Sequence, residues 1–226
     1  MAAAMMLVVF AGFARTFYLS SWLEPGRSAT SDSVFYVHGT VFTAWIVFLI
    51  VQPTLIAAGH IRLHRKLGWL GGAVAAAVVI TGVHAGLVAA ARPADAAIAA
   101  NTPEFLGVIL FGIVLYGLLV GLALAFRNDS QYHKRFMLLA TINLLQAAVV
   151  RFPLDLPGDF GPVTTFLYAD AFILPLLVWD IAVLRRIHPA TIWGGLAIII
   201  SLPVRFWFSG TALWLTIAEW AVALVR

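Results

Sequence analysis

Histidines and arginines inside apolar stretches are the residues of this chain that could do chemistry. In the stretch 131–153, His133 opens an apolar run of about four helical turns and Arg151 closes it. If the stretch is helical, His133 and Arg151 are separated by five whole turns. The two side chains then lie on one face of the helix, about 27 Å apart. A hydrocarbon core is ~30 Å thick. One helix would therefore carry a titratable ring near one membrane face and a permanent cation near the other.

A first set of polar residues is predicted to meet near the membrane face on which Arg151 lies. An ionisable residue within a span costs at least ~2.5–3.5 kcal/mol to insert and usually faces protein or a water-filled cavity. Arginine keeps its proton, so several arginines around one carboxylate need an anion or water between them. Haem propionates, a lipid headgroup or a quinol-like ring would meet this need. This outer cluster consists of Arg15, His38, His84, Arg151, Asp170 and Arg205, and Glu219 in the tail is a further carboxylate that could reach it.

Each member of the outer cluster also has a structural interpretation. Arg15 and Arg151 can snorkel to the outer headgroups. Arg205 and Asp170 can form an ion pair that only holds helices together. A single histidine in a span is more often a hydrogen-bonded packing residue than a ligand. Two histidines at equal depth on neighbouring antiparallel helices favour a ligand pair more strongly.

A second set of polar residues is predicted near the opposite membrane face. His64 and His133 each open a helix, with His60, His188 and Asp180 nearby. We expect His64 and His133 to be ligands of a metal ion or of haem iron, because both flank the same side of the bundle. The alternative is a solvated basic face that binds anionic lipid. The local positive charge disfavours a bare divalent ion but would suit haem propionates, and a chain without cysteine has no thiolate ligand to offer.

The composition indicates which elements must position these residues. The chain of 226 residues is 62% hydrophobic and 11% charged, whereas soluble domains average roughly 45–50% and 25%. It is predicted to be one transmembrane domain, 1–226, in contact with the lipid bilayer. The basic residues lie in short loops beside apolar runs and so indicate orientation, not a nucleic-acid partner.

Seven apolar stretches are long enough to be spans of ~20 residues. They are 2–22, 34–59, 67–91, 104–126, 133–151, 163–184 and 190–208. The tail 211–226 is short for a span, and its Trp214, Glu219 and Trp220 favour an interfacial or re-entrant helix. The predicted fold class is therefore all-α, a polytopic bundle of seven transmembrane helices with a short C-terminal interfacial or re-entrant helix.

Lysine and arginine in the short connections predict the orientation. The turns at 60–66, 127–135 and 185–186 hold Arg62, Arg65, Lys66, Arg127, Lys134, Arg135, Arg185 and Arg186. The opposite loops hold Arg27 and Arg92 and gather most of the carboxylates. The N-terminus is thus predicted to be cytoplasmic and the C-terminus, after seven spans, periplasmic, in the inner membrane of a bacterium.

Glycine pairs in the third and fourth stretches predict close helix contacts. Gly68 with Gly72, Gly82 with Gly86, and Gly117 with Gly121 each have the small-xxx-small spacing. Such faces could also bind other membrane proteins in a complex. The motifs of zinc proteases, phosphate-binding loops and serine hydrolases are absent from the sequence, and no catalytic residue is predicted.

Three segments resemble those of an uncharacterised family of bacterial multipass membrane proteins. They read H-G-x-x-F-T-A-W from His38, H-R-x-L-G from His64 and H-x-R-x-M-L-L-A from His133, and the likeness extends to residues 12–18. The resemblance implies a multipass architecture and singles out these three histidines, whereas His84 lies outside the motifs. The chain is also loosely similar to b-type transmembrane cytochromes, in which histidine pairs on neighbouring helices hold one haem in each leaflet.

Three hypotheses about function follow. The leading one is an inner-membrane protein that binds haem b or a metal through histidines, as an electron carrier or as an accessory or assembly factor of a respiratory or photosynthetic complex. The second is a non-redox binder or transporter of a small anion or lipid through the arginine-lined outer cluster. The third is a structural subunit that packs against a larger membrane complex through its small-residue helix faces.

Overall fold

The computed structural model describes residues 1–23, 33–92, 102–152 and 162–225, and the regular structure in these ranges is helical. The predicted loops between the spans, at 24–33, 92–103 and 153–162, lie almost wholly outside the described residues. The elements are α1 (Ala2–Phe13), the π-helical turn η1 (Ala14–Tyr18), α2 (Ser20–Leu23), α3 (Ser33–Ala57), α4 (Ile61–Ala91), α5 (Pro103–Ala125), α6 (Ser130–Val149), α7 (Pro162–Asp170), α8 (Ile173–Leu184), α9 (Pro189–Ser209) and α10 (Ala212–Ala223).

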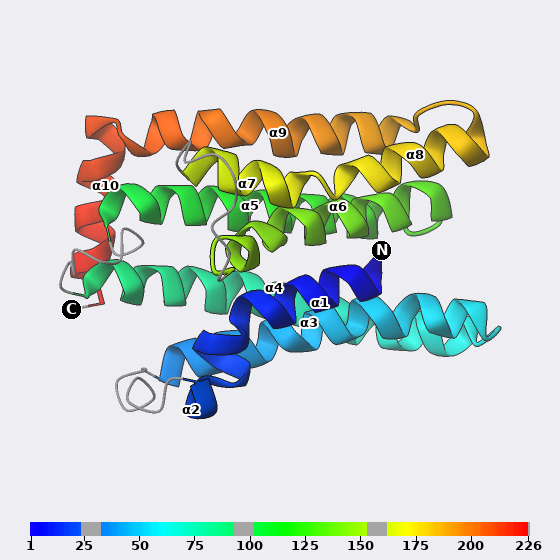
Figure 1. Ribbon diagram of the computed structural model, residues 1–226, viewed down its shortest axis with the longest axis horizontal. Helices are drawn as coiled ribbons and strands as arrows, with labels where there is room; N and C mark the ends of the chain where they lie inside the picture. Colours follow the sequence, from blue (N-terminus) through cyan, green and yellow to red (C-terminus); the bar gives the residue numbers. More distant parts are fainter. Residues whose placement is uncertain (24–32, 93–101, 153–161, 226) are drawn as a thin grey trace.

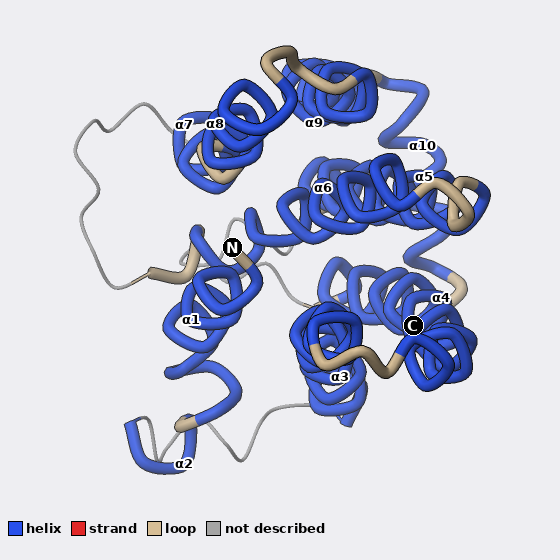
Figure 2. Tube along the Cα trace, turned by 90° about the vertical axis from the view of Figure 1, so that its right-hand side faces the viewer, coloured by secondary structure: helices blue, strands red, loops and turns tan. Residues whose placement is uncertain are grey.

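The long helices run side by side along the bundle, and α10 lies across one of its ends (Figure 1). The tight turns that join α3 to α4, α5 to α6 and α8 to α9 are at the other end, so the predicted basic turns do share one face of the molecule. Seen along the bundle, α5 and α6 lie between a layer of α7, α8 and α9 and a layer of α1, α3 and α4 (Figure 2).

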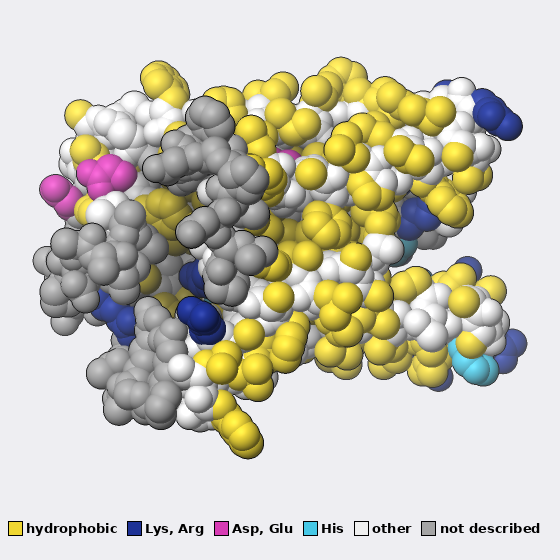
Figure 3. Space-filling model, viewed as in Figure 1, with side chains coloured by type: hydrophobic (Ala, Val, Ile, Leu, Met, Phe, Trp, Pro, Cys, Tyr) yellow, Lys and Arg dark blue, Asp and Glu magenta, His cyan; other side chains and the backbone are white. Residues whose placement is uncertain are grey.

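Within the described ranges, five helices are long and apolar enough to cross a membrane, which confirms the predicted membrane class. They are α3, α4, α5, α9 and the segment Thr165–Leu184, which contains most of α7 and all of α8. Their outward surfaces are covered by apolar side chains (Figure 3). The first and fifth predicted spans are not among these five, so the count of seven stays a prediction.

Helix α6 is the most polar of the long helices. It can carry polar side chains because much of its surface contacts other helices. It packs against α1, α5, α7 and α9. Its buried side chains include Arg135, Thr141, Asn143 and Gln146 among fully buried leucine and isoleucine. Polar groups inside a membrane bundle are stable where other helices supply their hydrogen-bond partners. Helix α6, which is the least suited of the long helices to face lipid, therefore lies at the centre of the molecule.

The predicted close contacts through glycine are used within the chain. Gly72, Gly82 and Gly86 on α4 face side chains of α5, and Gly117 on α5 faces Val79 on α4. A side chain at Gly82 would meet Ile113 Cδ1 at 3.1 Å. These glycines bring α4 and α5 together, and Gly68 and Gly121 face open space.

The predicted sixth span, 163–184, is divided into α7 and α8 by a break at Ala171 and Phe172. Pro175 has no N–H to donate to the carbonyl of Ala171, as a continuous helix would require. That carbonyl instead accepts from Leu174 N at 3.0 Å. The break places Asp170, the last residue of α7, beside α6 and α9.

The tail forms α10, which is anchored by Trp214. The indole Nε1 of Trp214 donates to the carbonyl of Pro103 at 2.9 Å, and the Thr211 side chain caps the helix by accepting from Trp214 N at 3.3 Å. Glu219 is exposed. The helix is thus fixed to the start of α5 across the end of the bundle, and its interfacial or re-entrant place in the membrane stays a prediction.

Candidate functional site

Two members of the predicted outer cluster, Asp170 and Arg205, belong to one buried hydrogen-bond network. Arg205 is 2% exposed and Asp170 is 5% exposed. Arg205 Nη1 donates to Gln146 Oε1 at 3.0 Å, and Gln146 Nε2 donates to Asp170 Oδ1 at 2.9 Å. Arg205 Nη2 donates to Ser201 Oγ at 2.6 Å and to Asn143 Oδ1 at 3.4 Å. The expected ion pair is therefore replaced by a chain in which an amide links the cation to the carboxylate.

The two amides of this network, Asn143 and Gln146, were not among the predicted site residues. They are three residues apart on α6, and so share a helix face. Asn143 Nδ2 also donates to the carbonyl of Gly112 on α5, at 2.8 Å. The signal that could have found them is their position in the apolar part of the fifth predicted span, where an amide needs protein partners.

The arginines at the other edge of the outer cluster lie apart from this network. The Arg151 guanidinium lies 4.9 Å from the centroid of the Phe13 ring and donates to the carbonyl of Ala147. Arg15 is exposed on η1. These contacts fit two arginines at the end of a bundle, and a role of either in binding a ligand stays a prediction.

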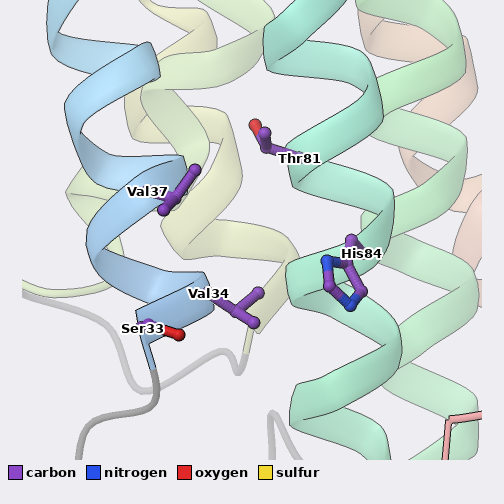
Figure 4. Close-up of a pocket in the computed structure, with 5 residues that line it drawn as sticks. All are labelled: Ser33, Val34, Val37, Thr81 and His84. Atoms are coloured by element: carbon purple, nitrogen blue, oxygen red, sulfur yellow. The ribbon is translucent and has the colours of Figure 1, made fainter.

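His38 and His84 both lie near Thr81, but they differ in hydrogen bonding and exposure. His38 Nδ1 lies 3.1 Å from Thr81 Oγ1, and the Thr81 hydroxyl donates to the carbonyl of Ala77 at 2.7 Å. Because that hydroxyl has one proton, His38 Nδ1 must be the donor to Thr81. His84 is exposed and lines a pocket between α3 and α4 with Ser33, Val34, Val37 and Thr81 (Figure 4). This arrangement offers no support for a ligand pair made of the two.

At the opposite end, Arg135 and Asp180 form an ion pair with both side chains 0% exposed. Arg135 Nε donates to Asp180 Oδ1 at 2.9 Å, and its Nη1 donates to the backbone and side-chain oxygens of Gln131 at 3.0 and 2.7 Å. Asp180 Oδ2 accepts from His188 N at 3.0 Å and from Thr191 Oγ1 at 2.6 Å. Among the described residues, both oxygens of Asp180 and all three nitrogens of Arg135 have hydrogen-bond partners, so this cluster connects α6 to α8 and α9.

His188 completes that cluster as the cap of α9. Its Nδ1 accepts from Ala190 N at 3.1 Å, and its ring lies edge-on to Tyr132 with centroids 4.6 Å apart. Burial lowers the pKa of His188 from its ordinary value, and the positive charge of Arg135 acts in the same direction. A neutral ring is also what the cap requires, because a protonated Nδ1 could not accept the hydrogen bond.

The predicted metal ligands His64 and His133 lie side by side. Their ring centroids are 6.4 Å apart and the ring planes make an angle of 86°. His133 Nδ1 donates to the carbonyl of Ala123 at 2.8 Å, which leaves Nε2 as its free nitrogen. Histidines that bind metals almost always donate their other ring N–H to a carbonyl or carboxylate, which fixes the tautomer and the ring orientation.

Three buried polar atoms of α3 and α4 have no hydrogen-bond partner among the described residues. They are His64 Nδ1 and both amide atoms of Gln52, Oε1 and Nε2. The backbone of Gln52 also contacts the His64 ring. A buried polar atom left unpaired costs about 1–3 kcal/mol. We therefore define the inner site as Gln52, His64 and His133, where α3, α4 and α6 meet.

The surroundings of the inner site are positive and partly open. Arg65 and Lys134 follow the two histidines and are exposed. Basic side chains gather at this end, which is hollowed between the α3–α4 hairpin and the rest of the bundle (Figure 3). Within the described ranges, no three or more histidine or carboxylate side chains are grouped as a metal site. The inner site therefore offers two imidazoles and one amide. No family model, curated protein or solved structure matches this chain.

Proposed function

We propose that His64 and His133 bind one transition-metal centre, and that the protein is an electron carrier or an accessory or assembly factor of a respiratory or photosynthetic complex. The observation that carries this proposal is the pair of adjacent rings, each with a nitrogen free for a ligand. In the proposed topology the chain crosses a bacterial inner membrane seven times, and the inner site faces the cytoplasm because the basic turns lie at that end.

The spacing of the rings supports a shared metal. A metal that binds two imidazoles at ~2.0–2.1 Å from each nitrogen holds ring centroids that are about 6 Å apart when the nitrogens are opposite. The observed 6.4 Å is close to this value. The supporting carbonyl contact that metal-bound histidines commonly make is already present at His133.

The charge of the surroundings favours haem iron over a bare divalent ion. Arg65 and Lys134 would repel a dication, whereas haem propionates would pair with them. The hollow in Figure 3 opens between the two helix groups that carry His64 and His133. Imidazole also suits copper, zinc and nickel, so a bare ion is the second form of the same proposal.

The other two hypotheses have less support. An anion in the outer cluster would have to compete with Gln146, Asn143 and Ser201 for the guanidinium of Arg205. Most of the glycines proposed to bind another protein already pack between α4 and α5. A partner protein would have to bind at other small residues.

The test is an absorption spectrum and metal analysis of the purified protein, with His64→Ala, His133→Ala and the exposed control His84→Ala. For haem, we expect a Soret band in the wild type and in the His84 variant that is lost from the other two. For a bare ion, stoichiometric metal without a Soret band should follow the same pattern. Absence of both, or their retention in His64→Ala and His133→Ala, would overturn the proposal.

A further inference from the structure

Two aspartates in the segment Thr165–Leu184 are both buried, but their carboxyl groups have very different partners. Among the described residues, Asp180 accepts hydrogen bonds on both oxygens, from Arg135, His188 and Thr191. Asp170 accepts from Gln146 on Oδ1, and its Oδ2 is buried without a hydrogen-bond partner in the part of the chain that the structure describes. An ionised carboxylate offers about four lone-pair positions to donors. Asp180 is thus solvated by the protein as an anion, and Asp170 is not.

The counter-charge of Asp170 is held at a distance. Helix α7 packs against α6 and α9. From α6 the facing groups are the neutral amides of Asn143 and Gln146, and from α9 the facing charge is Arg205. On α7 itself, Tyr168 is the neighbouring titratable residue in the described part of the chain. A buried carboxylate that lacks direct contact with a cation is costly to keep ionised.

The position of Asp170 is also unusual. It ends α7 at the break before α8, in a span that is otherwise continuous. Broken helices in membrane proteins commonly line sites for ions and protons, and carboxylates inside spans form proton relays. The break therefore places an incompletely solvated carboxyl group inside the bundle, with the Gln146 amide between it and the cation of Arg205.

We infer that Asp170 is a proton-binding site within the membrane domain. The proton adds to Oδ2 and converts the carboxylate to a neutral acid, while Oδ1 keeps its hydrogen bond from Gln146. Release of the proton restores the anion, whose charge is balanced by Arg205 through the amide. This site is independent of the inner site, and its test does not require a metal.

The test is infrared spectroscopy of the whole protein in lipid discs as the pH is varied between about 5 and 9. We expect a carboxylic-acid C=O band that gains intensity as the pH falls and is absent from Asp170→Asn. The control Asp129→Asn changes an exposed aspartate whose role as the cap of α6 an asparagine can fill, and it should keep the band.

A second variant keeps the inference testable if Asp170→Asn does not fold. Gln146→Ala removes the hydrogen bond that favours the ionised carboxyl group, so the midpoint of the band should move to higher pH. Spectra of Asp170→Asn that equal those of the wild type over this range would overturn the inference. Asp170 would then be a permanent counter-ion of Arg205. A midpoint unchanged in Gln146→Ala would overturn it as well.

Discussion

Arg135 and Asp180 are 45 residues apart in the sequence, and they meet as a buried ion pair that joins α6 to α8. Neither side chain is exposed. The pair sits at the end of the bundle that carries the basic turns, where the neighbouring arginines and lysines are exposed. Arg135 is buried, unlike the basic residues around it, and we therefore expect it to stabilise the fold.

Removal of Arg135 should destabilise the protein strongly. Arg135→Ala leaves the Asp180 carboxylate buried without its cation, and breaking a buried pair in this way costs about 3–5 kcal/mol. The free energy of unfolding can be followed by circular dichroism in mixed micelles with increasing denaturing detergent. The control Arg127→Ala removes an exposed arginine that donates to the carbonyl of Leu124, and should change stability by under about 0.5 kcal/mol. Equal losses in both variants would contradict a structural role for the pair.

Stability should fall as the pH drops below the ordinary pKa of histidine, 6.5, because of His188. Its pKa is lowered in the folded protein, so the unfolded chain binds more protons between that lowered value and 6.5. The free energy of unfolding therefore rises with pH through this window and decreases as the pH falls. Melting temperatures at a series of pH values give the slope.

The matched variant for this titration is His188→Asn. Asparagine can cap α9 without titrating, so part of the slope below pH 6.5 should disappear. His60→Asn makes the same replacement at an exposed histidine before α4 and is the control for the substitution itself. A slope of the same size in all three proteins would assign the pH dependence to other groups.

Gly12 is expected to tolerate no side chain. A Cβ at this position would collide with the backbone carbonyl of Ala148, so Gly12→Ala should force α1 away from α6 and lower the melting temperature. Gly121→Ala is the matched control, since nothing lies within 4 Å of its Cβ position. Alanine is favoured over glycine in a helix by about 1 kcal/mol, so this control should be neutral or stabilising. A Gly12→Ala protein as stable as the wild type would show that α1 is not held in close contact.

The sequence predicts how far along the bundle a residue lies better than it predicts to which side of its helix the side chain points. Apolar length and basic turns locate the helix ends, and they place His64 near His133 and Asp170 near Arg205. They do not say which side of a helix faces its neighbour. Gln146 was therefore not predicted as a site residue, although it links Asp170 to Arg205. Side-chain contacts between helices decide such directions, and a single sequence does not show them.

The same limit explains the outer cluster. Equal depth on adjacent helices predicts that His38 and His84 form a ligand pair, but depth does not say to which side of its helix each ring points. His38 is turned to hydrogen-bond Thr81, and His84 is exposed beside Ser33. The pair at the inner site lies at one end of the bundle, because His64 and His133 are each in the first turn of a helix that follows a short connection.

Gln52 should affect ligand binding and stability in opposite directions. Gln52→Leu keeps a side chain of similar size but removes two buried atoms without partners, so the ligand-free protein should gain about 1 kcal/mol. If the amide contacts the metal or its ligands, as groups around metal sites do, the affinity should fall by about 10- to 100-fold. Titration with haem or Cu²⁺, together with melting of the ligand-free protein, measures both effects. The control Thr54→Ala changes an exposed hydroxyl that donates within α3, and should alter neither. A less stable Gln52→Leu protein with unchanged affinity would show that the amide is structural, and would remove Gln52 from the inner site.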